Sequence, residues 1–379
     1  MLQTIEHIHY RNNGAVSMLE KGRISSIQLA FLIYPVIIAT GDLTAPALTA
    51  KHAGRDLWIS PFIASLVGVV MVLIVNRLSQ WYPGKTIVEY SEDILGKAAG
   101  KLLSALLLLF YLYICANILR QYSELIVGNY FSLTPVVVIS TSMLLVCSFA
   151  VRGGGEVLAR ASQIMVPVIF LSWVIIIALL LPDMKPERML PIMEKGIQPA
   201  FMGAVPLFTW FHHFGILAFF FPILSDRHKG LKWSLIAILV VTLVLTAINT
   251  TVLMIFGNIT TSLTYPTISA ARYISIAEFL TRLESIVMAL WVAGAFLKLS
   301  VFYYALALGS AQCLGLNDYR FLLFPFGILI TVYSFWLSPS LQEFSDYMGT
   351  SNVFFNYSME LGIPLLLFLV ALLRRRKSA

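Results

Sequence analysis

The chain has 379 residues, of which 59% are hydrophobic, 13% are aromatic and only 12% are charged, with a formal net charge of +7. A water-soluble domain carries about a quarter of charged residues, so this composition excludes a soluble domain. It predicts an all-α integral membrane protein embedded in the lipid bilayer.

Ten apolar segments are long enough to cross about 30 Å of hydrocarbon as helices. In chain order the predicted spans are residues 25–48, 57–76, 102–126, 133–151, 160–181, 201–224, 232–256, 284–314, 319–338 and 354–373. The polar residues before the first span lack the pattern of a cleaved signal, so that span is expected to be retained. Lysine and arginine gather in the connecting segments of one side, which includes the closing run 374–377. Because positive residues favour the cytoplasmic side, we expect both termini there.

The net positive charge is therefore a topology signal. No basic stripe with interleaved aromatic residues lies outside the spans, so no nucleic-acid partner is expected. Cys115, Cys147 and Cys313 lack the spacing of metal ligands, and the sequence has no nucleotide-binding loop and no nucleophile–base pair. We expect neither an enzyme nor a bound metal or cofactor.

Ten spans divide into two sets of five, and an odd number per half makes the halves enter the membrane from opposite sides. This arrangement permits an inverted repeat. We expect a single transmembrane domain over residues 1–379, with a first repeat at 25–181 and a second at 201–373.

The first span of each half carries helix-breaking residues at mid-depth, which predicts that both spans are discontinuous. The stretch "IIATGDLTAPAL" contains Gly41 and Asp42, and "FTWFHHFGILAFFFPIL" contains His212, His213 and Gly215. Backbone freed by such breaks lines a cavity or is buried in protein, so we expect a central binding site with half-helix N-termini that hold a carboxylate. Close packing is the alternative for a single glycine, and helix-to-helix hydrogen bonding is the favoured role for the histidines.

Lys298 lies about 14 residues, or roughly 20 Å, inside the eighth span, too deep to reach water easily. Such a group is expected to face the bundle interior with a partner. The candidates are Asp42, free carbonyl groups of the broken spans, or a substrate carboxylate. A structural ion pair with Asp42 is one reading; the other is function, with the ammonium replacing a sodium ion or carrying a proton.

Polar residues recur at helical spacing in the third and eighth spans. They are Tyr113, Asn117, Gln121 and Glu124 on the third span, and Ser300 and Tyr304 on the eighth. Each set occupies one helical face. Together they predict a small polar pocket near the midplane, with a polar seam between helices as the alternative.

Two connecting segments are expected to be structured. Thr86 and Glu89 form a capping box that predicts a short amphipathic helix through Leu95 on the cytoplasmic surface. Residues 265–280 are predicted to form an outer helix that covers the pocket as a lid.

Four features of the chain resemble the B subunits of spore germinant receptors, in the amino acid–polyamine–organocation superfamily. They are "YPGKTIVEY" after the second span, "YPT" before the outer helix, "GAFLKLSVFYYA" in the eighth span and the basic C-terminus. The resemblance implies a LeuT-like fold, a location in the spore inner membrane or bacterial cell membrane, and a complex with a larger A subunit and a lipoprotein C subunit. It also implies that a small nutrient, usually an amino acid, binds at the centre to start germination.

By this similarity, the ligand would contact one set of residues drawn from four spans. They are Thr40, Gly41, Asp42 and Leu43, then Tyr113 and Asn117, then Phe214 and Gly215, and finally Ser300 and Tyr304. A proton-coupled amino-acid transporter built on the same fold is the alternative function, because both activities need the same pocket.

Overall fold

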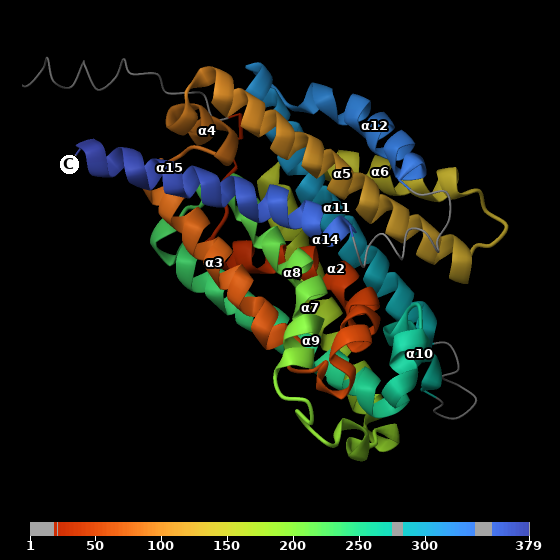
Figure 1. The fold of residues 1–379 in the computed structure, drawn as a ribbon. Coiled ribbons are helices and arrows are strands. Elements are labelled where there is room, and N and C mark those ends of the chain that lie inside the picture. Colours follow the sequence, from red (N-terminus) through yellow and green to blue (C-terminus); the bar gives the residue numbers. More distant parts are fainter. Residues whose placement is uncertain (1–18, 21, 275–282, 338–350, 379) are drawn as a thin grey trace, which may run out of the picture.

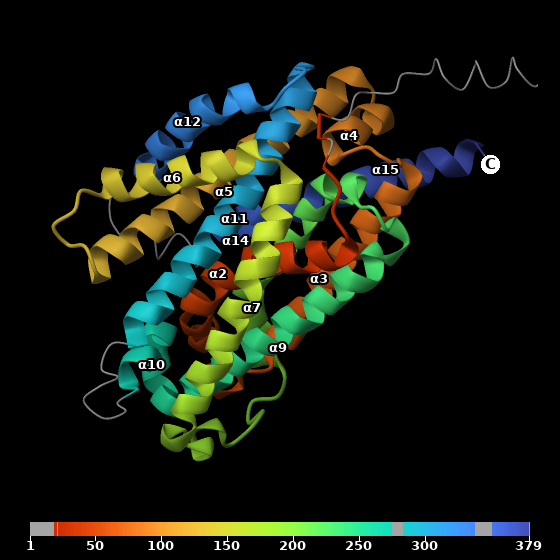
Figure 2. The same cartoon turned by 180° about the vertical axis from the view of Figure 1, so that it is seen from behind.

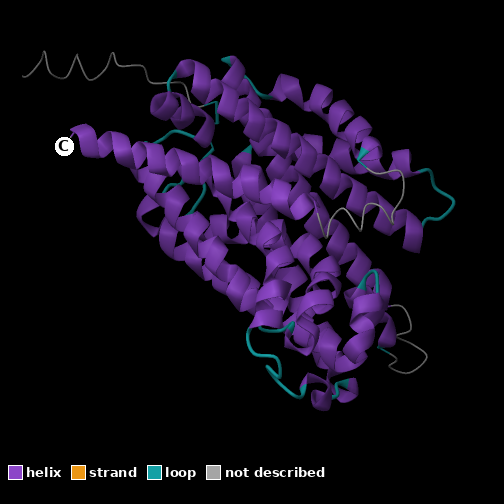
Figure 3. Ribbon diagram, viewed as in Figure 1, coloured by secondary structure: helices purple, strands orange, loops and turns teal. Residues whose placement is uncertain are grey.

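The computed structural model describes residues 19–20, 22–274, 283–337 and 351–378, and every long element in them is a helix (Figure 1, Figure 3). Within this described part of the chain, the single β-bridge joins Ile24 and Leu224. The all-α expectation is confirmed.

All ten predicted spans coincide with helices. Among the described residues, eight helices are long and apolar enough to cross a membrane, and two further apolar helices are shorter. The helices at the ten predicted spans are α2 (Ser26–Ala53), α3 (Ser60–Trp81), α5 (Lys97–Asn129), α6 (Val136–Arg152), α7 (Gly155–Leu180), α8 (Gln198–His212), α9 (Gly230–Phe256), α11 (Leu283–Leu314), α12 (Leu323–Trp336) and, at the last one, α14 (Ser351–Asn356), η10 (Tyr357–Leu361) and α15 (Gly362–Ser378).

Short 3-10 helices lie between or beside the spans. They are η1 (Gly54–Asp56), η2 (Leu181–Asp183), η3 (Pro186–Met189), η4 (His213–Phe219), η5 (Phe221–Ile223), η6 (Arg227–Lys229), η7 (Gly257–Ser262) and η9 (Arg320–Leu322).

The predicted break in the first span is wrong, because α2 continues through Gly41 without interruption. Pro46 has no N–H, so it leaves the carbonyl oxygen of Asp42 without its helical partner. The Thr267 hydroxyl, from a distant part of the sequence, donates to that oxygen instead. Neighbouring helices commonly satisfy backbone groups that a proline frees in a membrane helix, and the helix then continues.

The predicted break in the sixth span is confirmed. Helix α8 ends at His212, and the chain goes on as the 3-10 helices η4 and η5. The last span also departs from a regular α-helix, since residues Tyr357–Leu361 form a turn of π-helix. Such π turns frequently mark functional sites in helices.

Helices α2 and α8 form the centre of the bundle. In the most apolar stretch of their spans 72% and 78% of the residues are buried, against 28% in the span that contains α7. Helices α3, α9 and α11 pack around this pair, and α6 and α12 lie along α5 at one edge in both views (Figure 1, Figure 2). The first members of the two predicted repeats are therefore in direct contact.

The helices outside the spans lie at opposite ends of the bundle. Helix α4 (Ile87–Leu95) lies near the C-terminal end of α15, whereas α10 (Pro266–Tyr273) lies at the far end (Figure 1). The capping box is confirmed, because the Thr86 N–H donates to Glu89 Oε2 at 2.9 Å. The outer helix is confirmed for Pro266–Tyr273, and residues 275–280 of that prediction lie outside the described residues.

Candidate functional site

A small polar cavity lies at the centre of the bundle, where α2, α5, α8, α11 and α14 meet. Its polar lining consists of Thr40, Asn117, Gln121, Thr209, Trp210, His213, Lys298 and Asn356. The free space is enough for about one water molecule. A nutrient-sized ligand therefore requires these helices to move apart.

The Thr40 hydroxyl joins three helices at this cavity. Lys298 Nζ, on α11, donates to Thr40 Oγ1 at 2.7 Å, and Trp210 Nε1, on α8, donates to the same oxygen at 2.8 Å. Thr40 itself lies on α2. One oxygen thus accepts two hydrogen bonds from the helices on either side, and it fixes the ammonium group at the cavity wall.

Lys298 and Asp42 do not form a contact ion pair in the described structure, although both side chains are buried. The helical phase explains this. Residues 40 and 42 point about 200° apart on a helix, so a Thr40 side chain that faces Lys298 turns Asp42 away. Asp42 lines a separate small space with Tyr34, Trp173 and neighbouring apolar residues.

His213 is hydrogen-bonded across the bundle to a residue that sequence reasoning missed. Its Nδ1 lies 2.7 Å from Glu360 Oε2, and both side chains are almost fully buried. The expected helix-to-helix hydrogen bonding is therefore confirmed for His213. Glu360 is the only acidic residue in the predicted span 354–373, and an ionisable group inside a span is itself the signal that could have identified it.

The predicted polar face of the third span is present on α5 as a hydrogen-bonded ladder. Asn117 Nδ2 donates to the Tyr113 hydroxyl at 3.0 Å, and Gln121 Nε2 donates to Asn117 Oδ1 at 2.8 Å. Glu124 does not continue the ladder. It forms an ion pair with Arg120, with 2.6 Å between Glu124 Oε1 and an Arg120 guanidinium nitrogen. The ladder presents Asn117 and Gln121 to the cavity, with Tyr113 behind them.

The remaining residues expected to contact the ligand do not line this cavity. A side chain at Gly41 would meet Trp210 and Leu245, and Leu43 lines the space around Asp42. Phe214 and Gly215 pack toward α3, since a side chain at Gly68 would meet Phe214 and one at Gly215 would meet Met71. Ser300 lies beside Cys147 of α6.

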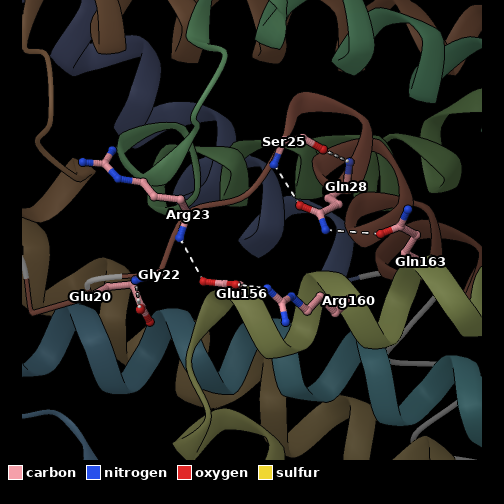
Figure 4. A network of polar contacts seen from close by, with 8 residues as sticks. All are labelled: Glu20, Gly22, Arg23, Ser25, Gln28, Glu156, Arg160 and Gln163. Atoms are coloured by element: carbon pink, nitrogen blue, oxygen red, sulfur yellow. Dashed lines mark hydrogen bonds and ion pairs between the residues drawn. The ribbon is translucent and has the colours of Figure 1, made fainter.

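Tyr304 lies at the end of the bundle near α4, in contact with the segment that precedes α2. Its hydroxyl donates to Glu20 Oε2 at 3.2 Å, and the Gly155 N–H donates to the same oxygen at 3.0 Å. The Arg23 N–H donates to Glu156 Oε2 at 3.2 Å (Figure 4). This N-terminal strap, residues 19–20 and 22–25, therefore ties α7 to α11. The structure thus gathers Thr40, Asn117 and Lys298 at one cavity and places Tyr304 at another site.

No group of three or more His, Cys, Asp or Glu side chains that could hold a metal ion occurs among the described residues. The polar groups at the cavity are instead one ammonium, hydroxyls, amides, an indole N–H and an imidazole. This set can hydrogen-bond a small polar organic molecule.

The sequence model of the family described as "Spore germination protein" matches residues 23–340. The chain belongs to this spore germination protein family. Spore germination protein KB of Bacillus subtilis (strain 168) is 28% identical over 368 residues, which cover 95% of this chain and 97% of the relative. Spore germination protein GerLB of Bacillus cereus is 25% identical over 359 residues, 93% of this chain and 95% of the relative. The resemblance to the B-subunit family is thereby confirmed.

Two solved structures have the same fold. A substrate-bound, outward-open Na⁺-coupled sialic acid symporter matches with a TM-score of 0.70 at 13% identity, covering 96% of this chain and 82% of the symporter. MhsT in complex with L-phenylalanine matches with a TM-score of 0.63 at 11% identity, covering 92% of this chain and 89% of MhsT. The expected LeuT-like membrane fold is confirmed.

Proposed function

We propose that this chain is the nutrient-binding B subunit of a spore germinant receptor, and that an amino acid binds in the cavity beside Lys298 and triggers germination. Family membership and the transporter-type fold support a germinant receptor protein of the B type. The nutrient, its binding site and the trigger are the proposal.

The proposal is supported most directly by the incomplete hydrogen bonding of the buried Lys298 ammonium group. An ammonium group has three N–H donors. In the described part of the chain, the Thr40 hydroxyl is the one hydrogen-bond acceptor for it, and the side chain is only 2% exposed. A buried ammonium group with unused N–H donors is costly, and a ligand carboxylate can accept hydrogen bonds from them.

The groups around Lys298 complement the rest of an amino acid. The Trp210 N–H donates to the same Thr40 oxygen. In the bound state it would donate to the second oxygen of the ligand carboxylate instead. Asn117 and Gln121 of α5 offer amide groups for the ligand's amino group. With α2 unbroken at Gly41, side chains rather than half-helix N-termini supply the donors for the carboxylate.

The small size of the cavity supports a mechanism by which binding becomes a signal. A ligand that binds an open arrangement of α2, α8 and α11 better than the closed one shifts the population toward the open arrangement. In the receptor, an A subunit and a lipoprotein C subunit in the spore inner membrane would respond to this shift, with both termini of this chain in the cytoplasm. A proton-coupled transporter would cycle the same helices to move the amino acid.

The test is germination of spores that lack this chain, scored across single amino acids, sugars and their mixtures, together with radiolabelled uptake by growing cells. We expect loss of response to one nutrient with uptake unchanged. Normal germination with one uptake activity missing would overturn the receptor proposal in favour of transport.

A further inference from the structure

We propose that Glu360 is the counter-charge of Lys298 and the positioning residue of His213, so that the last span detects the state of the nutrient cavity. This inference rests on the proposed function for the identity of the cavity. Beyond that function, Glu360 would couple the cavity to the last span.

The geometry places Glu360 directly behind the cavity wall. His213 lines the cavity, and its Nδ1 lies 2.7 Å from Glu360 Oε2. The Glu360 side chain is 1% exposed, and its second oxygen, Oε1, is buried without a hydrogen-bond partner. A buried carboxylate whose second oxygen has no donor depends on a nearby positive charge for its stability.

Lys298 is that positive charge. It lines the same cavity as His213, which is the hydrogen-bond partner of Glu360. The other buried carboxyl group, on Asp42, is turned by the phase of α2 toward Trp173 of α7. Ionisable groups inside a membrane are expected to pair with one another, so we assign Lys298 and Glu360 to one charge-neutral unit beside His213.

The turn that carries Glu360 also contacts α8, both in its middle and at its end. The Tyr357 hydroxyl donates to the carbonyl oxygen of Val205, and the Tyr357 ring packs edge-on against His212 with 4.8 Å between centroids. Asn356, the residue before this turn, lines the cavity itself. The π turn therefore touches the cavity wall and the broken end of α8 at the same time.

These contacts define a route from ligand to the last span. A carboxylate that pairs with Lys298 reduces the attraction between Lys298 and Glu360, and any movement of His213 is passed to Glu360 through their hydrogen bond. The π turn and α15 then respond as part of the same helix.

The charge pairing is tested with Lys298→Met, Glu360→Gln and the double variant K298M/E360Q, by measuring the amount of each protein in the spore membrane. Each single variant leaves one uncompensated buried charge, so we expect a several-fold loss of protein for each and recovery in the double variant. The matched control is K298M/D42N, which should not recover. Recovery with Asp42→Asn instead of Glu360→Gln, or recovery with neither, would overturn the assignment of Glu360.

The positioning role is tested by nutrient dose–response curves, normalised to the amount of protein. Glu360→Gln should raise the nutrient concentration for half-maximal germination, because it weakens the bond that holds His213 in the wall. Ser358→Ala in the same turn should leave that concentration unchanged, since its hydroxyl bonds only to carbonyl groups of its own helix. An unchanged half-maximal concentration in Glu360→Gln would overturn the positioning role, while a wild-type chain with no nutrient response would refute the proposed function itself.

Discussion

Lys298 on α11 donates a 2.7 Å hydrogen bond to Thr40 on α2, and this bond links the two predicted repeats in the middle of the membrane bundle. The same Thr40 oxygen also accepts the Trp210 indole N–H from α8. A single hydroxyl on the helix that was expected to break is thus the acceptor for two neighbouring helices at the cavity.

Replacement of this hydroxyl should destabilise the bundle. Thr40→Val keeps the shape of the side chain but leaves the Lys298 ammonium and the Trp210 N–H without an acceptor, which should cost about 1–3 kcal/mol. The measurement is the thermal unfolding temperature of the detergent-purified protein. Thr44→Val is the control, because the Thr44 hydroxyl bonds only to the Thr40 carbonyl of its own helix. Equal losses in the two variants would contradict a special role for Thr40.

The contact between α10 and α2 predicts that substitutions of Thr267 and Pro46 have coupled effects on stability. Thr267→Val removes the donor to the Asp42 carbonyl that Pro46 leaves free, and the loss of this bond should cost about 1 kcal/mol. Pro46→Ala restores an N–H that bonds to that carbonyl within the helix. We therefore expect the double variant T267V/P46A to recover most of the lost unfolding temperature. Strictly additive effects of the two substitutions would refute this coupling.

The N-terminal strap depends on a glycine with a positive φ. Gly154 has φ +89°, and a side chain there would approach Glu20 Oε2 to 2.5 Å, so Gly154→Ala should be strained and should displace the strap. We expect a lower unfolding temperature, and a similar loss for Glu20→Gln, which weakens the bonds to Gly155 and Tyr304.

The control for Gly154→Ala is Gly128→Ala, inside α5. Apart from the adjacent residues and backbone of its own helix, no atom lies within 4 Å of the new Cβ, so this substitution should be neutral or stabilise the helix by about 0.5–1 kcal/mol. A Gly154→Ala protein as stable as Gly128→Ala would show that the strap does not contribute to stability.

The helices of the ten predicted spans could be predicted from the sequence because length and hydropathy indicate a membrane helix, although α6 and α12 are shorter than the other eight. The continuity of α2 could not, since the partner of the carbonyl that Pro46 frees is Thr267, a residue separated from it by most of the chain. Prolines and glycines indicate where a helix can break, and only the tertiary contacts decide whether it does.

The candidate site was predictable in part. Lys298 and Asn117 could be recognised as polar groups at mid-depth, and the structure brings both to one cavity. The partner of Lys298 was harder to predict, because a one-dimensional sequence does not fix the rotation of α2 that brings Thr40 to the cavity and turns Asp42 away. Glu360 was visible as a charge inside a span, but its pairing with His213 depends on the packing of the last span against the end of α8.

The most direct test of the account is binding of single amino acids and their carboxamides to the purified protein. The amides keep the side chain and amino group but lack the negative charge. We predict that the wild-type chain binds one amino acid and not its amide, and that the charge-balanced variant K298M/E360Q no longer discriminates between the two. Equal binding of acid and amide by the wild type, or full discrimination by the variant, would contradict recognition of a carboxylate by Lys298.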